Sequence, residues 1–282
     1  MIFATIRILT ILKFRLIGLL VFIFSGKRKK IALKNINFCF EPKCLIDQKN
    51  NKKIIKKSFM LLGHSLADFI LIRFYKKNYL DKIFTIKNLD YLKENLKLGK
   101  GVILSTGHFG SWELAAHYLA LNGYKCMILY KPMKDSKFLE KIIKDNREIA
   151  GNILIPKENS LLALFKHLKR GGIVLLASDQ HCYSNDGREV ELFGHNVRSH
   201  TAFINLSLKT GAPILPGFVY TKNLFNYEME ICEPINPERF KNSLDPELEM
   251  AILSNKYLET AIKKAPENWL WSHRRFKGLI NY

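Results

Sequence analysis

The pattern of apolar and polar positions changes near residue 100. Between residues 31 and 80, apolar residues recur at helical spacing among lysines, which predicts amphipathic helix. Beyond residue 100, short apolar and β-branched runs follow glycines and alternate with longer helical patterns. We therefore expect an α/β fold: a mixed, mainly parallel sheet covered by helices, with an N-terminal membrane-associated helical segment.

Individual elements can be placed from the same pattern. Strands are predicted at 102–106, 126–130, 153–155, 173–177, 214–220 and 227–232. Helices are predicted at 112–122, 135–150, 160–169, 201–210 and 247–264. We divide the chain into an N-terminal membrane anchor with a basic flank (1–30) and one larger domain (31–282), which consists of a helical lead-in (31–80) and an α/β core (82–282).

The first 25 residues are strongly apolar but are interrupted by Arg7, Lys13 and Arg15. The longest uncharged run, residues 16–26, reaches only ~16 Å as a helix, whereas a bilayer core is ~30 Å thick. The segment could span a membrane if its cationic side chains snorkel, or it could lie in the interface. A basic block at 27–30 would hold it at an anionic cytoplasmic surface. The alternatives are a cleaved signal peptide, which the charge order disfavours, and a buried core helix.

The overall charge adds to this interpretation. The formal charge is +20, and 17 Lys or Arg against three acids place +14 of it in residues 1–80. Such an excess attracts anionic lipid, nucleic acid or an acidic protein, or it is simply a solvated lysine-rich face. No nucleic-acid-binding motif is present, so we expect no nucleic-acid partner. The five cysteines form no CxxC pair and indicate reduced thiols in a cytosolic setting.

The candidate chemistry lies between the strand at 102–106 and the helix at 112–122. His108 and Glu113 are five residues apart, so they could meet only if His108 is in the turn and Glu113 in the first helical turn. The carboxylate would then fix one tautomer of an imidazole that acts as a general base on a hydroxyl. The amides of Gly110 and Ser111 would lie at a helix N-terminus, where they could bind developing negative charge.

This pair alone is a weak signal, because a hydrogen-bonded loop histidine beside a surface glutamate is the common alternative. No HExxH motif, Cys/His cluster, Walker motif, GxGxxG or Gly-x-Ser-x-Gly elbow occurs. We therefore expect no metal, no cofactor and no serine acyl-enzyme.

Two segments carry a family resemblance. Residues 101–113 read GVILSTGHFGSWE, and residues 266–277 read PENWLWSHRRFK. Both are similar to the late acyltransferases of lipid A biosynthesis, the HtrB family within the lysophospholipid acyltransferases, where an asparagine is common at the position of Ser111. Weaker similarity occurs at 32–40, 178–180, 192–194 and 210–213, so the resemblance runs from about residue 7 to 277.

The resemblance implies a membrane-bound O-acyltransferase of the inner membrane, acting at its cytoplasmic face. It would move a fatty acyl chain from acyl carrier protein to a hydroxyl of a lipid A precursor. His108 would be the base and Glu113 its partner. Arg147 would hold a phosphate or the thioester oxyanion, Asp179 would order the site, and Arg274 and Arg275 would meet glucosamine phosphates.

Each of these roles has an alternative. Arg147 could be a surface helix arginine, Asp179 a loop cap, and the two C-terminal arginines solvated charges. Trp269, Trp271 and Phe276 are more simply explained as core than as walls of an acyl groove. The remaining functional alternatives are another lysophospholipid or glycolipid acyltransferase and a non-catalytic basic membrane-binding protein. For the acidic carrier protein, the sequence offers one basic cluster on a predicted helix: Lys49, Lys52, Lys53, Lys56 and Lys57.

Overall fold

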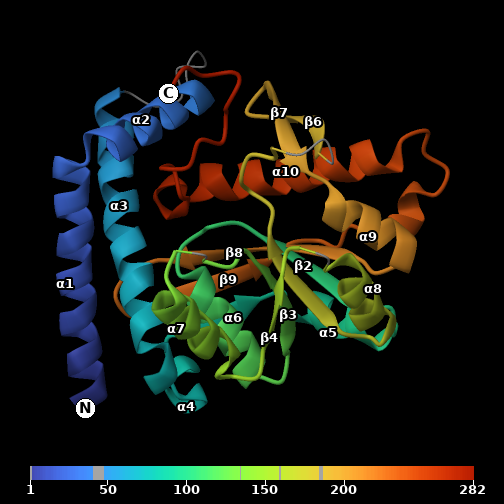
Figure 1. Cartoon of the computed structure of the whole chain (residues 1–282), viewed down its shortest axis with the longest axis horizontal. Coiled ribbons are helices and arrows are strands. Elements are labelled where there is room, and N and C mark those ends of the chain that lie inside the picture. Colours follow the sequence, from blue (N-terminus) through green and yellow to red (C-terminus); the bar gives the residue numbers. More distant parts are fainter. Residues whose placement is uncertain (1, 41–47, 134, 159, 184–186) are drawn as a thin grey trace.

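Seven strands form one mixed sheet at the centre of the protein, here described from a computed structural model (Figure 1). The structure describes residues 2–40, 48–133, 135–158, 160–183 and 187–282. The strand order is β1-β9-β8-β2-β5-β3-β4, and all neighbours are parallel except β8 and β9. The strands are β1 (Phe84–Lys87), β2 (Val102–Thr106), β3 (Cys126–Tyr130), β4 (Ile153–Pro156), β5 (Ile173–Ala177), β8 (Ile214–Thr221) and β9 (Tyr227–Ile231).

Helices cover both faces of this sheet, as the alternation of apolar runs predicts. Along β2, Val102 and Leu104 join the core beneath α5 and α6, whereas Ile103 points into the core beneath α8, α9 and α10. The helices of the α/β core are α5 (Leu89–Lys97), α6 (Trp112–Leu121), α7 (Lys137–Glu148), α8 (Leu161–Lys169), α9 (Ala202–Thr210) and α10 (Pro246–Lys264).

The predicted α/β class, with a mainly parallel sheet, is therefore confirmed. The strands expected at 102–106, 126–130 and 173–177 have these bounds in the structure, and the other three differ by one residue at an end. The sequence did not predict β1, α5, or the antiparallel hairpin of β6 (Gly187–Leu192) and β7 (His195–His200). β1 is a four-residue edge strand, and the hairpin is rich in charged residues, so neither carries a long apolar run.

The N-terminal third is helical, as expected, and consists of α1 (Ile2–Phe24), α2 (Gly26–Phe40), α3 (Gln48–Leu71), a 3₁₀ turn (Ile72–Phe74) and α4 (Lys77–Leu80). The part of this prediction at 41–47 lies outside the described residues. Helices α1 and α3 lie side by side at one end of the sheet (Figure 1). No single helix in the described ranges has the length and hydropathy of a membrane span. Taken together, α1 and α2 have the length and hydropathy of a span, but they are bent by 87° relative to each other.

A third cluster of buried side chains joins the helical part to the rest. It unites Ile36 of α2, Ile55 and Phe59 of α3, and Leu258 of α10 with aromatic residues of the C-terminal segment. Trp269, Trp271 and Phe276 are each at most 2% exposed within this cluster, so they are core residues. The helical lead-in thus shares a core with the segment that follows α10.

Candidate active site

His108 lies in a five-residue turn between β2 and α6, at the carboxyl end of the central sheet. Gly110 makes the turn possible: its φ is +53°, and a Cβ there would come within 2.3 Å of the Val219 carbonyl oxygen. The turn is also tied to the C-terminal segment, because the Leu270 amide donates to the His108 carbonyl at 3.1 Å. Glu113 lies in the first turn of α6, as predicted.

The carboxylate that holds the imidazole is Asp179, and not Glu113 as we expected. His108 Nδ1 and Asp179 Oδ1 are 2.8 Å apart, and the His108 amide donates to Asp179 Oδ2 at 2.9 Å. The indole N–H of Trp269 donates to the same Oδ2 at 3.0 Å. Asp179 follows β5 and His108 follows β2, and these parallel strands are neighbours with Thr106 beside Ala177. The topology therefore brings the two side chains together across 71 residues.

The electrostatics fit this pairing. Burial alone would lower the pKa of His108 and raise that of Asp179. The mutual attraction and hydrogen bonds outweigh burial, so the pKa of His108 lies above its ordinary value and that of Asp179 falls to about 2. Asp179 thus stays ionised at neutral pH and accepts the Nδ1 proton, which leaves Nε2 of a neutral His108 as a hydrogen-bond acceptor.

Glu113 instead pairs with Arg147, which the resemblance also singled out. Arg147 Nε donates to Glu113 Oε2 at 3.0 Å and its Nη2 to Oε1 at 2.5 Å, in a forked pair. Trp112 donates its indole N–H to Glu113 Oε1 at 3.2 Å and packs edge-on against His108. Both charged side chains are mostly buried, so Arg147 is not a solvated surface arginine. Glu113 acts on His108 at a distance, because its negative charge raises the pKa of His108.

The amides expected to bind an oxyanion are already used. The Gly110 amide donates to the Asn268 carbonyl oxygen at 2.8 Å, and the Ser111 amide donates to Thr221 Oγ1 at 3.0 Å. Ser111 stands at the N-cap position of α6, but its side chain makes no capping hydrogen bond. The geometry therefore gives Gly110 and Ser111 a role in shaping the turn, and does not support the predicted oxyanion site.

The two C-terminal arginines have different surroundings. Arg275 is 1% exposed and donates to the Arg198 carbonyl and to Ser199 Oγ, both at 2.7 Å. Burial lowers its pKa to about 10. A side chain so enclosed cannot meet a sugar phosphate at the surface, so this part of the expectation is not supported. Arg274 is half-buried and lies over the ring of Tyr282.

His108 faces a small cleft between the helical part and the C-terminal segment, and a quarter of its side chain stays exposed. Among the described residues, no group of three or more His, Cys, Asp or Glu side chains is placed to hold a metal ion. The walls of the cleft are largely apolar and come from α3, α6 and the segment after α10: Leu61, Leu62, Trp112, Trp269 and Leu270.

Comparison with known proteins identifies the family. The family model described as bacterial lipid A biosynthesis acyltransferase matches residues 7–278. The chain belongs to this family. It is therefore an acyltransferase, and the alternative of a non-catalytic membrane-binding protein is set aside.

Individual relatives agree with this assignment. The acyltransferase is 30% identical over 264 residues to the lipid A biosynthesis palmitoleoyltransferase of Escherichia coli, a match that covers 93% of this chain and 82% of that protein. It is 23% identical over 262 residues to the lipid A biosynthesis lauroyltransferase of the same organism, covering 93% and 83% of the two chains. A phosphatidylinositol mannoside acyltransferase of Mycobacterium tuberculosis is 27% identical over 141 residues, which is 49% of this chain and 43% of that one.

Proposed function

We propose that this acyltransferase moves a fatty acyl chain from a carrier-protein thioester to a hydroxyl of a lipid A precursor, at a membrane surface, with the His108–Asp179 pair as general base. The hydrogen bond between His108 Nδ1 and Asp179 Oδ1 carries this proposal, because it leaves Nε2 to take a proton in the small cleft, where Gln180 Nε2 lies 3.4 Å from it. The family assignment supplies the reaction class and the acceptor.

The proposed step balances as follows. The acceptor hydroxyl oxygen attacks the thioester carbonyl carbon while His108 Nε2 takes the hydroxyl proton. A carbon–oxygen bond forms, the carbon–sulfur bond breaks, and the imidazolium returns its proton to the leaving thiolate. Asp179 stabilises the imidazolium during the step, as its pairing with His108 requires.

Arg147 is proposed to hold an anionic group of the acceptor or the developing oxyanion. Its guanidinium has further N–H donors beyond the two that bind Glu113, and the pair remains partly exposed. Glu113 then acts by fixing Arg147. The sequence had suggested instead that Glu113 pairs with His108. Because Glu113 pairs with Arg147, we expect its replacement to shift the pH dependence of kcat/KM much less than replacement of Asp179.

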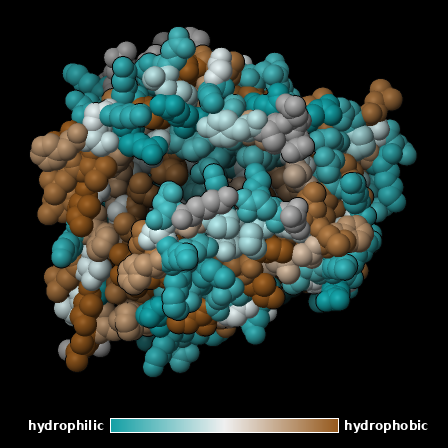
Figure 2. All heavy atoms as spheres, viewed as in Figure 1, coloured by the Kyte–Doolittle hydropathy of each residue, from teal (hydrophilic) through white to brown (hydrophobic). Residues whose placement is uncertain are grey.

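Exposed apolar side chains support a membrane location. Along the outer side of α1 they include Leu9, Leu16 and Leu20, each at least 44% exposed, and apolar residues form a broad area over this helix (Figure 2). Patches of this kind mark interaction sites when they are contiguous. We propose that α1 rests against the inner membrane from the cytoplasmic side, with the basic residues 27–30 near lipid headgroups.

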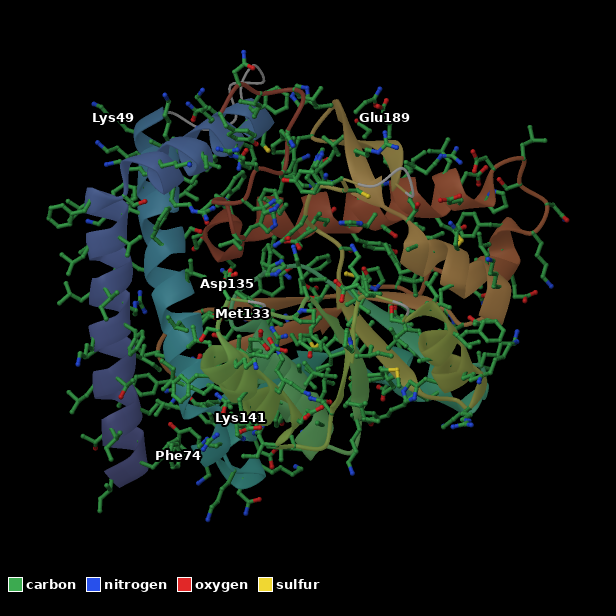
Figure 3. All side chains as sticks on the ribbon, viewed as in Figure 1. Lys49, Phe74, Met133, Asp135, Lys141 and Glu189 are labelled. Carbon is green, nitrogen blue, oxygen red and sulfur yellow. The ribbon has the colours of Figure 1, made fainter. Side chains whose placement is uncertain are left out.

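Helix α3 links this surface to the cleft. Leu62 lines the cleft beside His108, and exposed apolar side chains follow it at intervals of four residues: Leu66, Ile70 and Phe74. The N-terminal end of α3 carries the basic cluster proposed for the carrier protein, and Figure 3 shows Lys49 at that end, far from Phe74 in the 3₁₀ turn that follows α3. An acidic carrier at that end would deliver a thioester toward the cleft from the solvent side.

The test is a reaction with purified full-length protein, acyl carrier protein thioester and a lipid A precursor in mixed micelles. Mass spectrometry of the lipid should detect one added acyl ester. The same chain supplied on coenzyme A should react more slowly. Equal rates with both thioesters would contradict the carrier-protein donor, and absence of the ester product would contradict the proposed acceptor.

A second acceptor class, a phosphoglycolipid without the lipid A disaccharide, is suggested by one of the relatives. The resemblance to a phosphatidylinositol mannoside acyltransferase covers about half of this chain. A parallel reaction with a phosphoglycolipid lacking the lipid A disaccharide would separate the two: we expect transfer only to the lipid A precursor.

A further inference from the structure

Helix α1 is fitted tightly to α3 and does not merely lie beside it. A Cβ on Gly18 would come within 2.2 Å of the Phe59 carbonyl oxygen, and one on Gly63 within 2.1 Å of the Phe14 carbonyl oxygen. Each helix thus contributes one glycine where the other's backbone approaches. Such contacts allow two helices to pack with their backbones close together. The relative position of α1 and α3 is therefore fixed.

Near the N-terminal end of this contact, α1 carries a fully buried arginine. Arg7 has no exposed surface, and its side chain donates to the Tyr75 hydroxyl at 2.7 Å, to the Leu224 carbonyl oxygen at 2.6 Å and to the Tyr227 hydroxyl. Tyr75 lies after α3 and its 3₁₀ turn, Leu224 lies between β8 and β9, and Tyr227 is the first residue of β9. A buried cation so enclosed must have a compensating charge.

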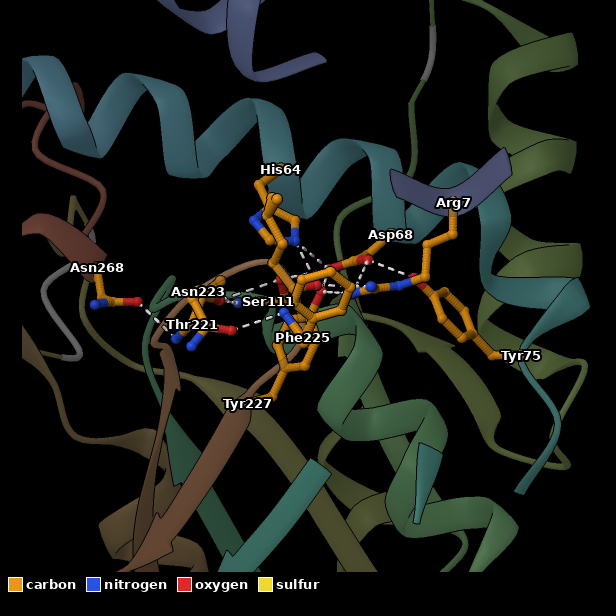
Figure 4. A network of polar contacts seen from close by, with 11 residues as sticks. Arg7, His64, Asp68, Tyr75, Ser111, Thr221, Asn223, Phe225, Tyr227 and Asn268 are labelled. Carbon is orange, nitrogen blue, oxygen red and sulfur yellow. Dashed lines mark hydrogen bonds and ion pairs between the residues drawn. The ribbon is translucent and has the colours of Figure 1, made fainter. Parts of the chain in front are cut away.

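That charge is Asp68 of α3, also fully buried, with Oδ1 3.8 Å from Arg7 Nη2 (Figure 4). The tyrosine hydroxyls bridge the pair: Tyr75 donates to Asp68 Oδ1 at 2.6 Å and Tyr227 to Oδ2 at 2.8 Å. His64 Nε2 lies 3.6 Å from Oδ2, but burial lowers the pKa of His64 to about 4, so it is neutral at neutral pH. Of these two basic neighbours, Arg7 is the one that supplies charge.

Asp68 also reaches the active-site turn. Ser111 donates its hydroxyl to Asp68 Oδ2 at 2.8 Å, and this serine is only three residues from His108. The Ser111 amide is held by Thr221, whose own amide donates to Asn268 Oδ1 at 2.8 Å. The turn is therefore held from three directions: by Asp179, by β8 with the C-terminal segment, and by the carboxylate on α3.

We propose that Arg7 and Asp68 are positioning residues for acyl transfer, acting through Ser111 on the turn that carries His108. The ion pair fixes the position of the Asp68 carboxylate, and this carboxylate fixes the Ser111 hydroxyl. The first residues of α6 are thereby held in one position relative to the cleft. A displacement of ~1 Å at a reacting group can cost ~10²-fold in rate. This inference rests on the proposed role of His108 as base, and it makes α1 part of the active-site scaffold.

Ser111→Ala is the decisive variant, because it cuts the link to the turn and leaves the Arg7–Asp68 pair intact. We expect kcat to fall about tenfold or more with KM nearly unchanged, since the groups lining the cleft are retained. The matched control is Ser207→Ala on α9, which removes another buried hydroxyl, one that donates to the Ala212 carbonyl oxygen at 2.6 Å. We expect this control to keep wild-type kcat even if its Tm falls as much.

Arg7→Met tests the other end of the network. If it folds, its loss of kcat and that of Ser111→Ala should not add in the double variant, because both act through Asp68. If it does not fold, Ser111→Ala still decides the question. Wild-type kcat in Ser111→Ala, or an equal loss of kcat in Ser207→Ala, would overturn the proposal. Failure of the proposed function itself would look different: wild type and Ser207→Ala would then give no acyl ester product at all.

Discussion

Replacing Asp179 by asparagine removes one charge from the candidate base and changes few atoms. Asp179 accepts three N–H donors, from the His108 ring, the His108 amide and the Trp269 indole. An asparagine side chain has a single acceptor oxygen, so at least one of these donors would face an NH₂ group. The simplest relief is a change of tautomer that puts the proton on Nε2, where the imidazole can no longer act as a base.

The size of the effect follows from that loss. A positioned general base contributes ~10²–10⁴ in rate, equivalent to ~2.7–5.4 kcal/mol of barrier. We therefore expect kcat/KM of Asp179→Asn to fall by at least ~10²-fold. The pH profile should change as well. A base must be neutral, so wild-type kcat/KM should decline as the pH falls through a His108 pKa that lies above its ordinary value. Without the Asp179 charge, that decline should move to lower pH.

The assay is steady-state acyl transfer with the carrier-protein thioester, measured across the histidine range for both enzymes. Asp245→Asn is the matched control, because Asp245 also accepts a backbone N–H, from Leu248 at the start of α10, and its pKa is also lowered. It should keep wild-type kinetics. If Asp179→Asn kept nearly the wild-type kcat/KM, and if its kcat/KM declined over the same acidic pH range as in the wild type, the assignment of the base would be refuted.

Three further predictions follow from other parts of the molecule. Glu113→Ala and Arg147→Ala should each lower kcat/KM by ~10-fold or more, and the double variant should lose much less than the product of the two single losses. The decline of kcat/KM at acidic pH should shift far less in these variants than in Asp179→Asn. Independent losses of kcat/KM would contradict the pairing of Glu113 with Arg147. Replacing the exposed α1 side chains Leu9, Leu16 and Leu20 with glutamine should weaken salt-resistant binding to anionic vesicles by ~1 kcal/mol or more per residue, whereas the same change at exposed Leu244 should not. If the α1 variant bound vesicles as tightly as the wild type, α1 would not be the membrane surface. Replacing the basic cluster of α3 with glutamine should flatten the salt dependence of kcat/KM with the carrier-protein donor and leave kcat nearly unchanged, in micelles whose only anionic lipid is the acceptor. A full salt dependence there would direct attention to Arg73, Lys76 and Lys77 instead. That cluster is Lys49, Lys52, Lys53, Lys56 and Lys57.

The sequence predicted the central strands β2, β3, β5 and β8 because each is a short, mainly apolar run that begins shortly after a glycine. The position of His108 followed from the same pattern, since the turn between β2 and α6 is bounded by a clear strand and a clear helix. The carboxylate that pairs with it could not be predicted with equal force. Asp179 follows β5, and only the strand order makes β5 the neighbour of β2. A sequence gives strands in chain order, and their order in the sheet depends on long-range packing.

Glu113 was the plausible partner because it is close in sequence. In the structure its carboxylate turns to Arg147, 34 residues away, which offers two N–H donors in a fork. Arg7 raised a similar difficulty. A cation in an apolar N-terminal run suggested a side chain that snorkels to headgroups, whereas the fold buries it against Asp68. Pairs of buried charges at such separations leave no periodic signal in the chain.

The central claim is that His108 catalyses the addition of one acyl chain to a lipid A precursor. Its most direct test is mass spectrometry of lipid A from the source organism after deletion of this gene, with complementation by wild type or by His108→Ala at matched protein levels. We predict lipid A that lacks one acyl chain in the deletion strain, full restoration by wild type, and none by His108→Ala. Unchanged lipid A in the deletion strain, or restoration by His108→Ala, would contradict it.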